Sequence, residues 1–303
     1  MAETGLASAL AGPVTAADAV RDLARRFRGA GLPTPELDAR LLVLEAAVLT
    51  QEDYVLSPRR PLTSETAQRI ETFARRRLFR EPVSRIVGRR EFWGRSFALN
   101  GATLDPRPET ETLVEAVLGI IDAEGRRNLP LRLLDLGTGT GCILLSLLAE
   151  LPAAWGLGMD IALDALTVAR RNAETHGLAD RAAFCCGDWM EPIFSGAFDF
   201  ILANPPYIKS EDIAGLEPEV RDHDPMRALD GGADGYDAYR HIAREALTVA
   251  APGAHLAFEA GAGQMRHICD LLVAAGWSRD TASCRVYADL SGQDRVVVVR
   301  KQR

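Results

Sequence analysis

Residues 131–141 read LRLLDLGTGTG, an apolar run that changes into three closely spaced glycines. The run is typical of a buried strand, and Gly137, Gly139 and Gly141 stand between it and a helix expected over 140–150. Glycines at this point allow a tight turn and the close approach of a ligand, although a plain connecting turn would also use them. Because the loop lacks the lysine and hydroxyl residue of a P-loop, it indicates a nucleoside-bearing ligand and does not require a pyrophosphate.

Strand and helix patterns alternate on both sides of this loop. Such alternation predicts an α/β fold, a doubly wound and mostly parallel Rossmann-like sheet covered on both faces. No helix pattern separates the last two strand patterns, so we expect an antiparallel hairpin at one edge. The predicted strands are 131–137, 155–160, 182–188, 198–204, 253–260, 283–290 and 295–300, and the predicted helices are 140–150, 162–176, 236–250 and 263–275.

The first eighty residues have helical patterns only. Thr15 and Asp18 form a capping-box pair, Pro35 opens a second helix, and residues 63–79 form a third. A further helix is expected within 105–122, where Pro108 marks its first turn. We therefore predict three parts: a small all-α docking domain at 1–82, a β-hairpin-like connector at 83–104, and an α/β domain at 105–303.

Charge is unevenly distributed along the 303 residues. Residues 1–90 contain 15 Arg and 11 Asp or Glu, a net charge of +4, and the remainder contains 20 Lys or Arg against 31 acidic residues, a net charge of −11. A protein that binds nucleic acid usually has a basic surface where it acts, so the acidic α/β part indicates no direct nucleic-acid contact.

Composition also limits the environment of the protein. No apolar stretch is long enough to span a membrane, and the N-terminal segment lacks the pattern of a secretion signal. The five cysteines have the spacing of neither a disulfide framework nor a zinc site. These features predict a cytoplasmic protein with reduced thiols and no metal.

Acidic and aromatic residues follow the second and third predicted strands. Asp160 ends the second strand, where a carboxylate can bind both hydroxyls of a ribose. Asp188 and Trp189 follow the third, where they could flank a purine by hydrogen bonding and stacking. A core or rim position for the Trp189 ring is an equally good interpretation.

The fourth predicted strand ends in Asn204, Pro205, Pro206 and Tyr207. Each proline pushes the residue before it into an extended conformation, which leaves two acceptors at a fixed spacing, the Asn204 side-chain oxygen and the Pro205 carbonyl. Two such acceptors can hold both hydrogens of a planar NH2 group. A strand-terminating turn is the simpler alternative, but in the usual doubly wound order this strand lies beside the first and its glycine loop.

Holding a planar nitrogen has a chemical use. The lone pair of an amide is delocalised, and fixing both hydrogens orients the nitrogen toward an electrophile such as a methyl group on a sulfonium. Orientation can supply up to about 7–11 kcal/mol. Tyr207 could pack on the planar group or on the cation.

Five segments together resemble a known family: residues 88–111 (GRREFWGRSFALNGATLDPRPETE), 135–141 (DLGTGTG), 204–208 (NPPYI), 229–239 (LDGGADGYDAY) and 258–264 (FEAGAGQ). The chain is similar to the HemK-type peptide chain release factor glutamine methyltransferases, which depend on S-adenosyl-L-methionine. The resemblance implies methyl transfer to the side-chain amide nitrogen of the glutamine in the GGQ loop of class 1 release factors, with S-adenosyl-L-homocysteine as the second product.

The resemblance also implies roles for individual residues. Asn204, Pro205, Pro206 and Tyr207 would hold the glutamine, the N-terminal domain would dock the release factor, and we expect a monomer. The residues implied to contact the cofactor are Gly137, Thr138, Gly139, Thr140, Gly141, Asp160, Trp189 and Asn204, to which the strand-end argument adds Asp188.

Three alternatives remain at this stage. An enzyme that methylates an exocyclic amine of a nucleic acid could use the same tetrapeptide but would need base flipping and a basic track. A related enzyme could modify a glutamine of a ribosomal protein, and a non-catalytic nucleotide-binding module could keep the same fold. The roles of Glu109 and Glu111 are also open, between contact with the cofactor's amino group and a favourable charge in the first helical turn.

Overall fold

The computed structural model describes residues 14–191 and 198–302. The chain divides after Gly88 into two compact units, each with its own hydrophobic core. The segment on which the prediction about a secretion signal depends lies mainly in residues 1–13, outside the described part.

The first unit consists of helices α1 (Ala16–Gly29), α2 (Pro35–Ala47), α3 (Gln51–Leu56), α4 (Ser64–Leu78) and α5 (Val83–Val87). The capping box is confirmed, because the Asp18 N–H donates to Thr15 Oγ1 and the Thr15 N–H donates to the Asp18 carboxylate, each at 3.3 Å. Pro35 is the first residue of α2, as predicted. Phe27, Leu42 and Ile70 are fully buried where three of the helices pack together.

The connector prediction for residues 83–104 was partly wrong. Its first five residues form α5, which Gly88 ends with a φ of 80°. The hairpin itself is confined to β1 (Arg89–Phe92) and β2 (Arg95–Ala98), which pair antiparallel. A helix of five residues is too short to give a helical period, so the sequence pattern could not distinguish it from a strand.

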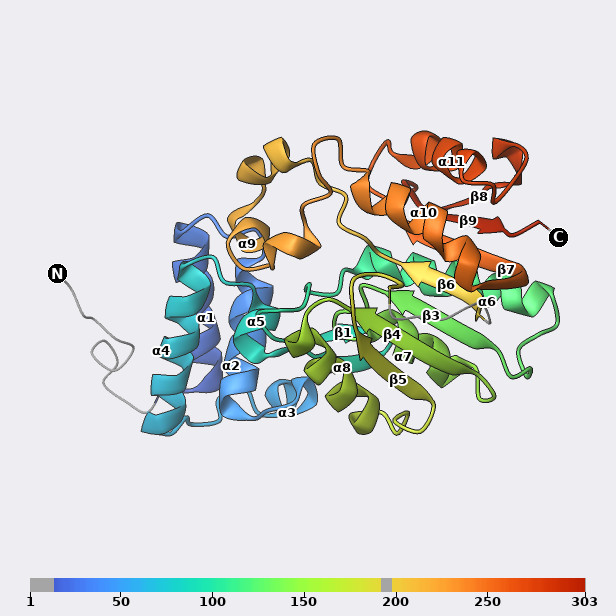
Figure 1. The fold of residues 1–303 in the computed structure, drawn as a ribbon. Helices are drawn as coiled ribbons and strands as arrows, with labels where there is room; N and C mark the ends of the chain where they lie inside the picture. Colours follow the sequence, from blue (N-terminus) through green and yellow to red (C-terminus); the bar gives the residue numbers. More distant parts are fainter. Residues whose placement is uncertain (1–13, 192–197, 303) are drawn as a thin grey trace. The chain divides into compact units, whose positions relative to one another are not determined.

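The second unit contains the predicted doubly wound sheet (Figure 1). Seven strands lie in the order β5-β4-β3-β6-β7-β9-β8, with β3 next to β6 as expected. The first five strands are parallel, and β9 and β8 add the predicted antiparallel hairpin at one edge. Their bounds are β3 (Arg132–Leu136), β4 (Trp155–Asp160), β5 (Ala182–Cys186), β6 (Phe198–Ala203), β7 (Ala250–Glu259), β8 (Arg285–Ala288) and β9 (Asp294–Arg300).

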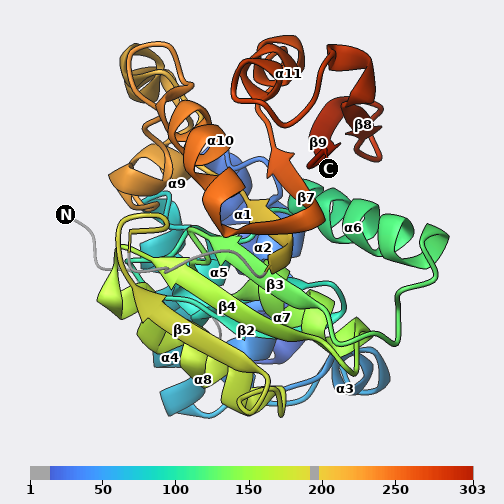
Figure 2. The ribbon, with the colours of Figure 1, turned by 45° about the vertical axis from the view of Figure 1, so that its right-hand side comes forward.

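Helices cover both faces of this sheet. Alternate strand residues point to opposite faces, so Leu133 and Phe200 belong to one core and Leu134 and Ile201 to the other. The first core packs on α6, α7 and α8, and the second on α10 and α11; Figure 2 shows α7 and α8 on the side opposite to α10 and α11. The helices are α6 (Glu111–Ala123), α7 (Cys142–Glu150), α8 (Leu163–Thr175), α10 (Asp237–Val249) and α11 (Met265–Ala274).

A long connection joins β6 to α10. It contains the 3-10 turns η3 (Ser210–Gly215) and η4 (Met226–Ala228) and the short helix α9 (Pro218–Arg221). Two further 3-10 turns lie elsewhere in the unit, η2 (Pro108–Thr110) directly before α6 and η5 (Thr281–Ser283) before β8.

Candidate active site

The strand register brings the predicted site residues to one edge of the sheet. Leu136 pairs with Met159 on one side and with Ala203 on the other, and Ala203 pairs with Phe258. Because these strands are parallel, their carboxyl ends meet at one edge, and the switch point, where the strand order reverses, lies between β3 and β6. The residues at these ends are Gly137, Asp160, Asn204 and Glu259.

The glycine loop is a tight turn that is attached to the second strand. Gly137, Gly139 and Gly141 have φ values of 71°, 55° and 79°, which only glycine adopts at low cost. The Gly139 N–H donates to Asp160 Oδ2 at 2.9 Å, and the Ala162 N–H donates to Oδ1 at 2.8 Å. The loop and the carboxylate are therefore held together, with Asp160 half-buried at the pocket.

A pocket opens at this edge of the sheet. Besides loop and strand-end residues, its wall includes Thr110 and Arg107 from the segment before α6, which the sequence analysis did not assign to the site. Of the twelve predicted site residues, ten line it: Gly137, Thr138, Gly139, Thr140, Asp160, Asp188, Trp189, Asn204, Pro205 and Pro206.

Trp189 stands out among the lining residues because of its backbone. Its φ is 47°, an unfavourable conformation for a bulky side chain. Its ring centroid lies 6.2 Å from that of His241 on α10, and the ring is half-buried. The neighbouring Asp188 is exposed. Backbone strain of this kind is often found at ligand sites, where the surroundings hold it in place.

Gly141 and Tyr207 do not line the pocket. Gly141 is buried at the start of α7. The Tyr207 ring packs against Gly261, where an added Cβ would lie 2.9 Å from its Cδ2, and the Tyr207 carbonyl accepts a hydrogen bond from Gln264 Nε2 at 3.1 Å. Burial raises the pKa of the Tyr207 hydroxyl, so it stays protonated at neutral pH. Residues 258–264 (FEAGAGQ) therefore pack against the NPPY loop on the side away from the pocket.

The Asn204 amide has a defined orientation. Its Nδ2 donates to the hydroxyl of Thr110 at 3.3 Å. An amide that turns its nitrogen toward Thr110 presents its oxygen on the other side, as an acceptor requires. Asn204 is half-buried in the pocket wall, next to the glycine loop that follows the adjacent strand.

Two buried carboxyl groups were missed by the sequence analysis. Glu259 is 2% exposed and Asp135 is fully buried, and burial raises the pKa of each to about 7. The Thr138 hydroxyl donates a hydrogen bond to Asp135 at 2.6 Å, which lowers the pKa of Asp135 and offsets part of the effect of burial. The available signal was their position, since each acid lies in or at the end of an apolar strand that leads to the site.

The open question about Glu109 and Glu111 has a partial answer. The Glu111 carboxylate accepts a hydrogen bond from the Trp93 N–H at 2.8 Å, so it connects α6 to the β1–β2 hairpin. Glu109 is exposed, and neither residue lines the pocket. The geometry therefore favours a structural role for Glu111 and places Glu109 outside the pocket wall.

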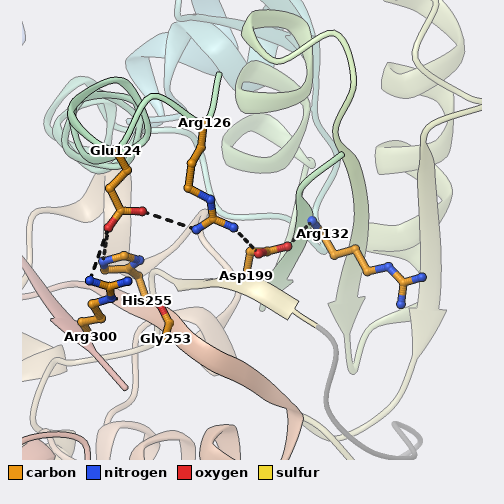
Figure 3. Close-up of polar contacts among 7 residues, drawn as sticks. All are labelled: Glu124, Arg126, Arg132, Asp199, Gly253, His255 and Arg300. Carbon is orange, nitrogen blue, oxygen red and sulfur yellow. Dashed lines mark hydrogen bonds and ion pairs between the residues drawn. The ribbon is translucent and has the colours of Figure 1, made fainter. Parts of the chain in front are cut away.

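At the opposite edge of the sheet, where the parallel strands begin, charged side chains form a network of ion pairs (Figure 3). Asp199, at the start of β6, pairs with Arg126 and accepts the Arg132 N–H at 2.9 Å. Glu124 lies 3.4 Å from Arg126 and 3.5 Å from His255. Burial lowers the pKa of His255 to about 4, so the ring is neutral where it stacks on Phe200.

Within the described part of the chain, no group of three His, Cys, Asp or Glu side chains has the arrangement of a metal site. All five cysteines are free. None of the helices formed by the described residues has the length and apolar character needed to cross a membrane.

The seven-stranded sheet, with the glycine loop and Asp160 at a pocket, has the Rossmann-like fold of the S-adenosylmethionine-dependent methyltransferases. The fold is also that of the hMettl16 catalytic domain, solved in complex with the MAT2A 3'UTR hairpin 6. That structure has a TM-score of 0.55 and 16% identity, over 78% of this chain and 82% of that one.

Family models and relatives narrow the class. Residues 18–88 match the PrmC N-terminal domain, and residues 120–216 match the methyltransferase small domain. A release factor glutamine methyltransferase of Rhodospirillum rubrum is 49% identical over 91% of this chain and 82% of its own. One from Bradyrhizobium diazoefficiens is 48% identical over 93% of both chains. The chain belongs to the release factor glutamine methyltransferase family, which confirms the resemblance.

Proposed function

We propose that the protein transfers a methyl group from S-adenosyl-L-methionine to the side-chain amide nitrogen of the glutamine in the GGQ loop of class 1 release factors. Family membership supports this substrate. The observation that carries the proposal is the Asn204 amide, which lies in the pocket wall beside the glycine loop with its nitrogen turned toward Thr110. Its oxygen is thereby available to accept a hydrogen from a substrate amide.

The residues at the other strand ends fit the cofactor. Backbone N–H groups and positive-φ glycines of loop 137–141 allow close approach, Asp160 would hold the ribose hydroxyls, and Asp188 and Trp189 would flank the adenine. When bound, S-adenosylmethionine supplies an electrophilic methyl carbon on a sulfonium.

The acceptor residues do their work by placement. Asn204 Oδ1 and the Pro205 carbonyl would each accept one hydrogen of the substrate NH2, which turns the nitrogen lone pair toward the methyl carbon. The two oxygens also stabilise the positive charge that develops on nitrogen. The extra proton becomes acidic only after the new C–N bond forms, so no base is needed beforehand. Pro206 and Tyr207 would keep this backbone in place.

The helical unit would dock the release factor. It carries exposed apolar side chains, which suit a protein partner: Leu37, Leu41, Val48, Val55, Leu56 and Phe79. A protein partner also agrees with the net negative charge of the residues after 90, which does not suit direct nucleic-acid contact. We propose that the enzyme acts as a monomer.

The test compares Asn204→Ala with wild type, using radiolabelled methyl donor and purified release factor, ribosomal protein and DNA. Wild type should label the release factor, and the variant should lose about 10²–10³-fold in kcat while donor affinity falls less. Asn128→Ala is the matched control, since Asn128 is exposed and outside the pocket. A variant with wild-type turnover, or label found on nucleic acid alone, would contradict the proposal.

A further inference from the structure

The orientation of the Asn204 amide determines which chemical group the site can bind. The two ends of an amide have nearly the same shape, but one donates and the other accepts hydrogen bonds. With the oxygen toward the substrate, the site binds an NH2 group; with the nitrogen toward it, the site would bind a carbonyl or carboxylate. Thr110 cannot choose between these states alone, because a hydroxyl both donates and accepts.

Glu259 supplies the missing preference. It is the last residue of β7, and the pairing of Ala203 with Phe258 makes it the cross-strand neighbour of Asn204. Its side chain is 2% exposed, and Oε2 has no hydrogen-bond partner in the described structure. The nearby Thr110 hydroxyl and Asn204 amide both favour its charged form. A buried carboxylate therefore lies directly beside the ambiguous amide.

An ionised carboxylate accepts hydrogen bonds and never donates them. Beside it, the amide nitrogen of Asn204 is attracted and the amide oxygen is repelled. We infer that Glu259 is a positioning residue that keeps the Asn204 oxygen toward the substrate, and that it thereby makes the site select a carboxamide over a carboxylate. The inference rests on the proposed function, because it assumes that Asn204 holds the substrate amide.

The surroundings of Glu259 determine when it is charged. Burial raises its pKa to about 7, and Arg295 favours the charged form. Arg295 is itself paired with Asp289 at 3.1 Å, so it compensates only in part. Glu259 therefore loses its charge as the pH falls through about 7. The other titratable groups that interact with it are Glu109 from η2, Cys142 from α7, Tyr207 after β6 and Tyr239 from α10.

The kinetic test uses Glu259→Gln, which keeps the shape and removes the charge. We expect kcat/KM for the release factor to fall about 10- to 100-fold at pH 8, the factor for one hydrogen bond to a charged group. In wild type kcat/KM should fall below pH 7, because this parameter reports groups of the free enzyme. Glu259→Gln should lack this decline, Glu259→Asp should keep it, and Glu115→Gln, at an exposed position on α6, should match wild type.

A specificity readout separates positioning from a general loss of packing. A GGQ peptide should inhibit wild type more strongly than the same peptide with glutamate in place of glutamine. In Glu259→Gln this preference should shrink by about tenfold or more, because both amide orientations become possible. An unchanged preference would overturn the inference, as would a wild-type kcat/KM in Glu259→Gln.

A third readout does not depend on activity. The side-chain ¹⁵N–¹H signals of Asn204, assigned with Asn204→Ala, should shift with a midpoint near pH 7 in wild type and stay constant in Glu259→Gln. Flat signals in wild type would refute the coupling even if the enzyme methylates release factors. If wild type fails to methylate the glutamine, the proposed function fails while this titration still reports whether Glu259 controls the amide.

Discussion

Two acidic side chains at the carboxyl edge of the sheet differ from two at the amino-terminal edge in whether a cation compensates their charge. At the amino-terminal edge, Asp199 and Glu124 lie against Arg126, and the network also includes Arg132 and Arg300. At the carboxyl edge, Asp135 and Glu259 are more deeply buried, yet neither forms an ion pair in the described structure, and burial raises the pKa of both. Paired charges connect elements of the fold. Unpaired acids cost stability, and they stand where the reaction is proposed to occur.

The largest expected effect tests how rigid the carboxyl edge must be. In Gly231→Ala the new Cβ would lie 2.8 Å from Tyr207 Cα and 2.9 Å from the Pro206 carbonyl oxygen. These are backbone atoms, so the NPPY loop must shift, and a displacement near 1 Å can cost about 100-fold in rate. We expect kcat to fall by at least about 100-fold in a methyl-transfer assay.

The matched control for that substitution is Gly215→Ala, because a Cβ at Gly215 would meet nothing within 4 Å. Both variants should remain folded by circular dichroism. Full activity of Gly231→Ala would mean that the NPPY loop tolerates movement. The carboxyl edge of the sheet would then not need to be rigid for methyl transfer.

The second prediction measures what the unpaired acid costs. The pKa of Glu259 is raised in the folded protein from 4.5 to about 7. The folded protein therefore holds this proton more tightly than the unfolded chain, so wild-type stability decreases as the pH rises from 4.5 to 7. Glu259→Gln lacks this decrease, so its unfolding free energy relative to that of wild type should rise by on the order of 3 kcal/mol between pH 4.5 and pH 8.

Urea unfolding at pH 4.5, 6 and 8 would measure this difference. The unfolding free energy of Glu115→Gln, in which an exposed carboxylate is removed, should change with pH as that of wild type does. If the unfolding free energy of Glu259→Gln also followed wild type at all three pH values, the charge of Glu259 would be as well compensated as those of Asp199 and Glu124.

The smallest effect is expected at the amino-terminal edge. Arg126→Ala removes the pairs with Asp199 and Glu124 and a guanidinium that lies 5.9 Å from the centroid of the Phe200 ring. Both acids are about a quarter exposed, so the loss should be about 1 kcal/mol, with kcat within about twofold of wild type. Thermal unfolding and the methyl-transfer assay would check the two values, and a large loss of kcat would make this edge part of the active site.

Local patterns were sufficient for most of the fold. The apolar runs predicted the strands, the usual doubly wound order placed the fourth strand beside the first, and the strand ends placed Asp160 and Asn204 at one edge. Helix α5 escaped prediction because five residues give no period. Thr110 and Glu259 escaped it because their places depend on long-range contacts: the register between β6 and β7, and the return of the segment before α6 to the pocket wall.

The close fit of glycines around Tyr207 has a practical consequence for anyone who wants to redirect the enzyme. The backbone of Gly231, Gly235 and Gly261 packs directly against Pro206 and Tyr207 of the NPPY loop. Gly231 and Gly235 belong to the connection between β6 and α10, and Gly261 belongs to the turn after β7. Changing the substrate would therefore require redesign of both segments, because substitutions within the NPPY loop alone would leave the glycine contacts that fix its backbone unchanged.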